Sequence, residues 1–91
     1  MYTLVWSPAF TRSVEKFIKN HPDLRGKFAA ILRDLEIDPF QPHLKYHQLK
    51  GSFKGVQAVS ITYSYRLTLT ILVFDKEIIL LDVGSHDEVY R

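Results

Sequence analysis

Cysteine is absent from the 91-residue sequence, which excludes a disulfide framework and a thiolate metal site. Glycine and proline are scarce, at four residues each, whereas 46% of the residues are hydrophobic. Such a chain is expected to fold rather than to stay disordered. Long hydrophobic runs are also missing, because the longest, at 71–74 and 78–81, are far too short to span a bilayer. We therefore expect one domain over residues 1–91, in the cytoplasm, with no export signal or membrane anchor.

Acidic residues are absent between Asp38 and Asp75, a stretch in which basic residues accumulate. The basic residues of this stretch are His43, Lys45, His47, Lys50, Lys54 and Arg66. Clustered positive charge attracts polyanions such as nucleic acid, although the net charge of the whole chain is only +2. The alternative interpretation is that strands are poor in acids whatever they bind.

Two helices are predicted in the first half of the sequence. Ser7 and Pro8 are the residue types of an N-cap and a first helical position, and apolar residues then recur at helical spacing. The segment 20–22 breaks this pattern and opens a second helix, which Asp38 and Pro39 end.

Strands are predicted from residue 44 onward, where the apolar period changes from 3.6 to 2. The expected strands, including one at the N-terminus, cover 1–6, 45–49, 56–63, 65–74 and 78–83. The predicted element order is therefore β-α-α-β-β-β-β. Short links make neighbouring strands antiparallel, so we expect an α+β fold with two helices on one face of a small antiparallel sheet. The other face is expected to stay open to a partner, with Arg66 on it.

His43 and His47 have the i, i+4 spacing of a helical metal pair, but they fall in a predicted loop and strand. In an extended chain their Cα atoms lie about 13 Å apart, too far to share one metal ion. We therefore predict neither a metal site nor a cofactor. Each histidine can instead be a simple surface residue, although the nearby Lys45, Lys50 and Lys54 favour an RNA contact for His47.

Three further residues have side chains suited to RNA chemistry. Arg66 lies mid-strand, where its guanidinium must meet solvent, a carboxylate such as Asp82, or a ligand phosphate. His86 follows the last strand, and histidine is the residue type suited to proton transfer near neutral pH. Tyr90 is suited to stack on a base or to donate a hydrogen bond, although packing of the tail explains it equally well.

Together these groups match metal-free scission of RNA. The reaction needs groups that position the 2′-OH, remove its proton, protonate the departing 5′ oxygen and stabilise charge on the phosphate. His47, His86 and Arg66 cover these functions. Because DNA lacks the 2′-OH, RNA is the predicted substrate.

Three segments of the sequence form a set, namely 47–51 (HQLKG) with Gly55, 60–67 (SITYSYRL) and 83–90 (VGSHDEVY). The set resembles the RelE/ParE superfamily of toxins from toxin–antitoxin systems, nearest its RelE and YafQ branches. The predicted element order agrees with that fold, so the resemblance covers the whole chain. It implies an endoribonuclease toxin that cuts mRNA on the ribosome and is held inactive by an antitoxin protein.

The resemblance also implies residue roles. Arg66 matches the arginine that contacts the cleaved phosphate. His47 and His86 match histidines that YafQ-like members use in catalysis, and Tyr90 falls where an aromatic residue ends the motif. The residues expected to contact RNA around this catalytic set are His43, Lys45, Lys50, Lys54, Tyr65 and Arg91.

The sequence departs from the family pattern at two pairs of positions. Ser60 and Ser64 stand where YafQ-like members carry His and Asp, and Gln57 and Val59 stand where RelE-like members carry lysines. These departures predict weak activity or a different division of the acid and base roles. Two alternatives follow: a ParE-like toxin that inhibits gyrase, and a binding module without catalytic activity.

Overall fold

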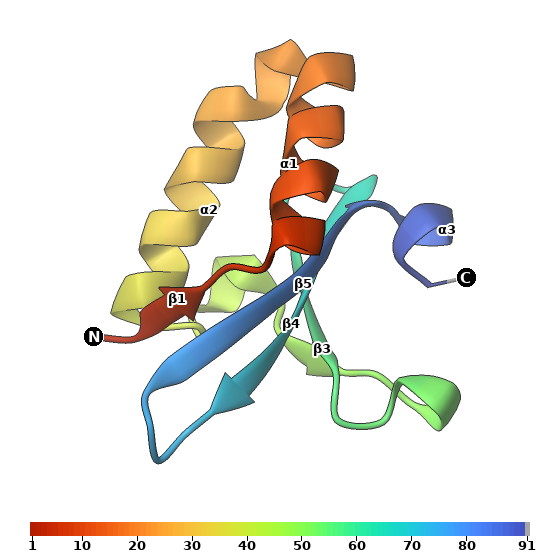
Figure 1. Ribbon diagram of the computed structural model, residues 1–91. Coiled ribbons are helices and arrows are strands. Elements are labelled where there is room, and N and C mark those ends of the chain that lie inside the picture. The colour runs from red at the N-terminus through yellow and green to blue at the C-terminus, as the bar shows by residue number, and fades with distance from the viewer. Residues whose placement is uncertain (91) are drawn as a thin grey trace.

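The computed structural model describes residues 1–90, in which two long helices pack on a five-stranded sheet (Figure 1). In chain order the elements are β1 (Thr3–Val5), α1 (Pro8–Asn20), α2 (Arg25–Ile37), β2 (His47–Gln48), β3 (Gln57–Ser60), β4 (Tyr65–Leu72), β5 (Glu77–Ser85) and α3 (His86–Val89). The 3₁₀ turns are η1 (Pro22–Leu24), η2 (Pro42–Leu44) and η3 (Gly51–Phe53). The predicted α+β fold and the predicted order of its long helices and strands are confirmed.

The sheet has the strand order β1-β5-β4-β3-β2 and differs from the prediction in one pairing. The pairs β2–β3, β3–β4 and β4–β5 are antiparallel, as their short links require. β1 runs parallel to β5, with Thr3 opposite Glu77. The sheet is therefore mixed, because a helical segment follows β1 and no hairpin fixes the direction of its partner.

α1 begins and ends where the sequence predicts, and α2 ends where predicted but begins only at Arg25, after a 3₁₀ turn at the predicted start. The Ser7 hydroxyl caps α1 by accepting a hydrogen bond from the backbone N–H of Phe10 at 3.1 Å, and Pro8 opens the helix. η1 separates α1 from α2, and α2 ends at Ile37, directly before Asp38. Within residues 1–90, no helix has the length and apolar character needed to cross a membrane.

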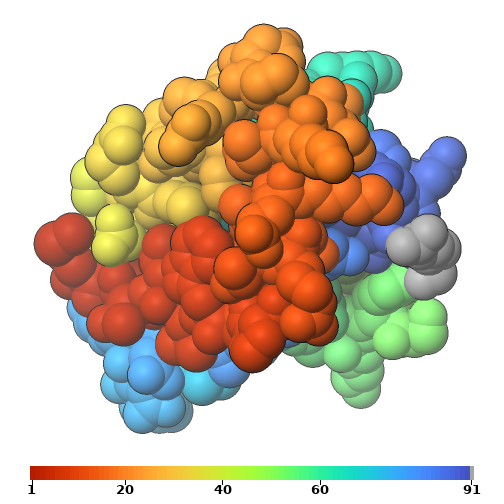
Figure 2. Space-filling view, turned by 45° about the horizontal axis from the view of Figure 1, so that its top comes forward, coloured from red at the N-terminus to blue at the C-terminus, as the bar shows by residue number. Residues whose placement is uncertain are grey.

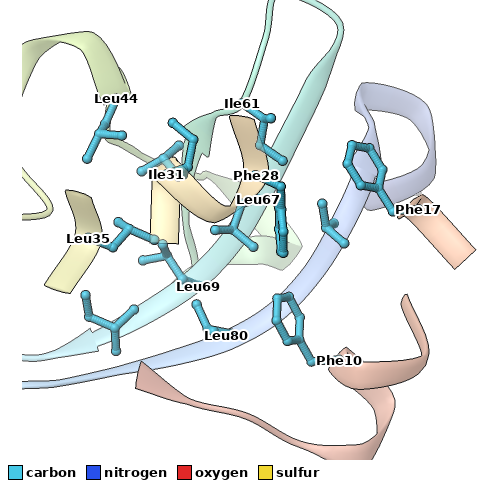
Figure 3. Packing of buried hydrophobic residues seen from close by; sticks show 13 residues of the cluster. Phe10, Phe17, Phe28, Ile31, Leu35, Leu44, Ile61, Leu67, Leu69 and Leu80 are labelled. Carbon is cyan, nitrogen blue, oxygen red and sulfur yellow. The ribbon is translucent and has the colours of Figure 1, made fainter. Parts of the chain in front are cut away.

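Buried hydrophobic side chains from α1, α2 and the strands form the core between the helices and the sheet (Figure 3). Phe10 of α1, Leu35 of α2 and Leu67 of β4 are all fully buried. Burying one such side chain contributes about 1.5–3 kcal/mol to folding. This contact holds the helices on one face of the sheet and fixes the position of the strands that carry the candidate site.

Four strands are shorter than predicted: β1 covers only Thr3–Val5 of the predicted 1–6, and backbone turns shorten β2, β3 and β4. Lys45 was expected in a strand but has a left-handed φ of 52° after η2, so β2 begins only at His47. β3 ends at Ser60 and β4 ends at Leu72, because turns follow both. In the second turn Lys76 also has a positive φ, of 53°. Neither lysine carries a sequence signal for this conformation, which is uncommon outside glycine and asparagine.

The sheet face opposite α1 and α2 is only partly open, because the chain covers some of it. Ala58 and Thr68 are paired on that face and are 0% and 4% exposed. α3 contacts β4 and β5, and the ring of Tyr90 reaches the ring of Phe53 in η3, with 6.0 Å between the centroids. The expectation of an open face therefore fails around Ala58 and Thr68, whereas Arg66 and Thr70 on the same face are partly exposed.

Candidate active site

The guanidinium of Arg66 is anchored to the turn between β3 and β4. Its Nη1 donates hydrogen bonds to the carbonyl oxygens of Thr62 at 2.8 Å, Tyr63 at 2.9 Å and Tyr65 at 3.2 Å. Within residues 1–90, Nε and Nη2 have no hydrogen-bond partner, so one edge of the guanidinium is open to a ligand. Such an edge can bind two oxygens of one phosphate side by side. The carboxylate of Asp82, considered above as a partner, instead accepts a hydrogen bond from the next backbone N–H at 2.8 Å.

A hollow of about 400 Å³ opens beside Arg66, between the β3–β4 turn and the start of α3. Arg66 pairs with Gly84 across β4 and β5, which brings the turn next to the residues that follow β5. The hollow, which we call the Arg66–His86 hollow, is lined by Tyr63, Ser64, Arg66, Ser85, His86 and Asp87. The His86 side chain is 67% exposed, and its Nδ1 lies 3.6 Å from Oδ1 of Asp87.

Tyr90 lies against His86 and close to Arg66. The rings of His86 and Tyr90 meet edge to face, with 4.3 Å between the centroids. The Tyr90 hydroxyl is buried and has no hydrogen-bond partner among residues 1–90. Burial raises the pKa of Tyr90, while the positive charge of Arg66 acts in the opposite direction. The structure therefore brings a guanidinium, an imidazole and a phenol together.

The residues at the start of α3 determine where His86 and Tyr90 lie. Ser85 and Glu88 form a capping box, in which the Ser85 hydroxyl accepts from the Glu88 backbone N–H at 3.3 Å and Glu88 Oε1 accepts from the Ser85 N–H at 2.8 Å. A Cβ at Gly84 would lie 3.0 Å from Glu88 Oε1 and 3.2 Å from Glu88 Cβ. Glycine thus lets α3 turn back against the strand that precedes it.

His47 lies on the same face of the sheet as Arg66 but two strands away. It pairs with Ala58 of β3, whereas Arg66 pairs with Ser60. Two strand spacings and a two-residue offset separate the Cα atoms of His47 and Arg66 by about 12 Å. His47 lines neither of the two hollows that contain Arg66. It is therefore the one proposed catalytic residue that stands apart from the other three.

A second hollow, of about 330 Å³, lies on the other side of Arg66. Its basic lining residues are Lys27 of α2, His43, Lys45 and Arg66, and we call it the Lys27–Lys45 hollow. Nε2 of His43 lies 2.8 Å from Oδ2 of Asp34 in α2. Within residues 1–90, no group of three or more His, Cys, Asp or Glu side chains is placed to hold a metal ion.

The other predicted RNA-binding residues have different positions. Lys50 and Lys54 are exposed at the two ends of η3. The Tyr65 ring packs on the helix side of the sheet, with centroids 5.4 Å from Phe17 and 4.5 Å from His21, so its position favours packing over an RNA contact. Arg91 lies outside the described residues.

Two site residues were not indicated by the sequence pattern. Tyr63 was expected at the end of the strand predicted over 56–63, but β3 ends at Ser60 and Tyr63 is 94% exposed. The sequence offered one signal for Tyr63, which is that it lies three residues before Arg66. Lys27 lies on the exposed side of α2, where a lysine is ordinary and carries no signal.

Comparison with known proteins finds a relative along the full length of the sequence. No family model matches the chain. Among curated proteins, the toxin named RelE4 from Methanocaldococcus jannaschii is 28% identical over 91 residues. The match covers 100% of this chain and 93% of that protein.

Solved structures share the fold. YafQ from E. coli strain BL21(DE3) has a TM-score of 0.83 at 20% identity, covering 100% of both chains. A metal-bound toxin from Helicobacter pylori has a TM-score of 0.81 at 26% identity, covering 99% of this chain and 100% of that one. The YafQ fold in the E. coli DinJ-YafQ complex has a TM-score of 0.80 at 22% identity, covering 100% of both chains.

The two-layer α+β fold, with a hollow between the β3–β4 turn and α3, is the fold of the solved YafQ structure. The particular resemblance is to the RelE superfamily, in its RelE and YafQ branches. The similarity in sequence and in fold extends over the whole chain, so the resemblance predicted from the three motifs is confirmed.

Proposed function

We propose that this chain is the toxin of a toxin–antitoxin pair and a metal-independent endoribonuclease that cuts mRNA. The observation that carries the proposal is that Arg66 and His86 line one hollow, with the Tyr90 ring packed against His86. These residues are separated in sequence, and only the pairing of β4 with β5 and the return of α3 bring them together. The likeness to the toxins named RelE4 and YafQ supports the same assignment.

In the proposed reaction the 2′ oxygen of the RNA attacks the adjacent phosphorus, and the bond from phosphorus to the 5′ oxygen breaks. Arg66 binds two phosphate oxygens through Nε and Nη2 and stabilises the charge that develops on them. His86 transfers a proton to or from the reacting oxygens. The Tyr90 ring, packed against the imidazole, fixes its orientation.

His47 has a different role in this scheme from the proton exchange with His86 expected from the sequence. His47 lines neither hollow that contains Arg66, and its Nδ1 lies 3.0 Å from the carbonyl oxygen of Lys45. We therefore assign His47 to the RNA backbone beside Lys50 and Lys54, and proton transfer to His86. The second proton exchanges with solvent, to which the hollow is open. One proton-transfer residue instead of two makes slow cleavage the expected outcome.

We further propose that the mRNA is presented by the ribosome and that an antitoxin protein blocks the site. E. coli YafQ forms a complex with DinJ, which supports a protein partner for this fold. An acidic segment laid over Arg66 and the basic hollow next to it would neutralise the charges that bind phosphate. The antitoxin is therefore expected to protect Arg66 and His86 from solvent.

The second candidate function is RNA binding without cleavage. It is favoured by Ser60 and Ser64, which cannot exchange protons at neutral pH, and by the distance of His47 from the hollow. In this alternative Arg66 and the lysines hold the strand, but no group activates the 2′-OH.

Cleavage of a reporter mRNA on translating ribosomes, mapped by primer extension, tests the proposal. We expect His86→Gln to lower the cleavage rate at least 100-fold, because a positioned acid–base group contributes on this scale. The matched control is His21→Gln, a histidine whose ring packs on Tyr65 outside the hollow. Circular dichroism must show that both variants fold.

The outcomes separate the two functions. Unchanged cutting by His86→Gln and by Arg66→Gln contradicts the site assignment. Tight RNA binding and growth arrest without any cleaved product contradict the nuclease and support the binding module.

A further inference from the structure

Two hollows lie on either side of a ridge formed by Tyr63 and Arg66. Both residues line the Arg66–His86 hollow and also the Lys27–Lys45 hollow. The two hollows are therefore adjacent, and together they extend from α3, across the β3–β4 turn, to α2. A ligand longer than one phosphate that is bound at Arg66 must leave the first hollow, and the second lies directly across the ridge.

The lining of the Lys27–Lys45 hollow is basic. Lys27 and Lys45 are exposed, and neither forms an ion pair within residues 1–90. His43 already contacts Asp34 at 2.8 Å, so the two lysines and Arg66 carry the charge available to a ligand. The residues that line the hollow include no acid. Like charges gathered in this way attract a polyanion, and they repel each other when it is absent.

Tyr63 stands between the hollows with an exposed ring on a fixed backbone. Its side chain is 94% exposed, while its carbonyl oxygen accepts a hydrogen bond from Arg66 Nη1 at 2.9 Å. Figure 2 shows the β3–β4 turn, in teal, projecting from the surface beside the end of α1. An exposed aromatic ring flanked by cations is the arrangement that binds single-stranded nucleic acid, because bases stack on the ring while phosphates meet the cations.

We propose that the Lys27–Lys45 hollow is a second RNA subsite, which holds the part of the strand that crosses the ridge from the scissile phosphate. Tyr63 stacks the base next to that phosphate. Lys27 and Lys45 bind the phosphates that follow it. This inference rests on the proposed function, since it extends the same RNA strand beyond the Arg66–His86 hollow.

Binding of a single-stranded RNA oligonucleotide, made uncleavable by 2′-deoxy substitution, tests the subsite by fluorescence anisotropy over a range of salt. The double variant Lys27→Gln, Lys45→Gln is expected to bind more weakly and to reduce the slope of log K against log salt by about 1.4, since each phosphate contact on a single strand contributes about 0.7. Lys76→Gln is the matched control, because Lys76 lies in the turn at the opposite end of β4.

Substitutions of Tyr63 test stacking separately from charge. Tyr63→Ala is expected to weaken binding about five- to 100-fold, whereas Tyr63→Phe keeps the ring and stays within about twofold of the wild type. An equal loss in both variants contradicts stacking, because it would assign the effect to the hydroxyl.

The possible failures are distinguishable. A wild-type protein that binds no RNA contradicts the proposed function and the subsite together. If the wild type binds RNA and the Lys27, Lys45 and Tyr63 variants bind it equally well, only the subsite is overturned. If polyglutamate of the same charge binds as tightly as RNA and loses as much in the lysine variants, the hollow recognises acidic protein segments and the RNA subsite is overturned.

Discussion

Arg66 Nη1 donates to three carbonyl oxygens, two in the turn that carries Tyr63 and one at the first residue of β4. One nitrogen of the side chain therefore stabilises the turn, while the other two are available to a phosphate. A lysine at this position keeps the charge but offers a single ammonium group, which cannot serve both partners. At the scale of the residue, the geometry of the guanidinium, as well as its charge, therefore explains why an arginine stands at this position.

Tyr90 allows a prediction that separates stability from function. Its hydroxyl is buried without a hydrogen-bond partner among residues 1–90, and an unsatisfied buried polar group costs about 1–3 kcal/mol. Tyr90→Phe removes the hydroxyl and keeps the ring on His86. We expect the free energy of unfolding in urea to rise by up to about 1 kcal/mol, while RNA cleavage stays unchanged, because the ring that orients His86 is kept.

Tyr2→Phe serves as the control for Tyr90→Phe, because the Tyr2 ring lies far from the hollow, near Lys76. It should leave cleavage unchanged. A marked loss of stability in Tyr90→Phe would show that the hydroxyl has a partner in solution, and the explanation of its burial would then be wrong.

α3 is the element on which the site depends, and Gly84 controls its position. A Cβ added at Gly84 would lie 3.2 Å from the Cβ of Glu88, near the backbone of α3, so the helix must shift to admit it. Gly84→Ala is therefore expected to destabilise the protein by about 1–3 kcal/mol, as overpacking does. It is also expected to lower cleavage at least tenfold, because His86 and Tyr90 move with the helix.

Gly26→Ala is the matched control, measured by urea unfolding and by cleavage. A Cβ at Gly26 meets nothing within 4 Å, and the residue lies in α2. Alanine is favoured over glycine in helices, so stability should rise by up to about 1 kcal/mol with cleavage unchanged. Equal behaviour of the two alanine variants would contradict the role given to Gly84.

The elements differ in how well the sequence predicts them, and the reason is the range of the interactions that fix them. α1 is predicted well because its cap at Ser7 and its apolar stripe are local. The strand ends are not, because they follow from positive φ values at Lys45 and Lys76 that no local pattern indicates. β1 and β5 are more than seventy residues apart in sequence and pair in parallel. The length of a connecting loop therefore cannot predict this pairing.

The parts of the candidate site that depend on contacts between distant segments are likewise the parts that the sequence does not predict. Arg66 and His86 were recognised from residue type and motif, but their meeting in one hollow depends on the pairing of β4 with β5. α3 was predicted as a tail, although the spacing of Ser85 and Glu88 is that of a capping box. The strand predicted over 56–63 includes Tyr63, although β3 ends at Ser60, because alternation does not show where a strand stops.

At the scale of the whole molecule, two tyrosines are expected to make the stability of the fold depend on pH in the alkaline range. Burial raises the pKa of Tyr46 and of Tyr90 above the ordinary value of 10.0, and the charge of Arg66 offsets part of the effect at Tyr90. The folded state therefore keeps these two protons at a pH where the unfolded chain has begun to lose them. Their contribution to stability is complete below about pH 10 and is lost as pH rises through the folded-state pKa values.

Urea unfolding measured between pH 8 and pH 11.5 tests this coupling, with the range chosen to bracket the ordinary tyrosine pKa of about 10. We expect the free energy of unfolding to fall above about pH 10, and to fall less steeply when Tyr46 and Tyr90 are both replaced by Phe. Lysines titrate in the same range, so the difference between the wild type and the double variant, rather than either curve alone, isolates the tyrosines. Replacement of Tyr63, which is 94% exposed, by Phe is the control for the loss of a hydroxyl from the surface. Parallel curves for the wild type and the double variant would mean that neither hydroxyl is buried in solution, and that the C-terminal segment does not cover the sheet as described.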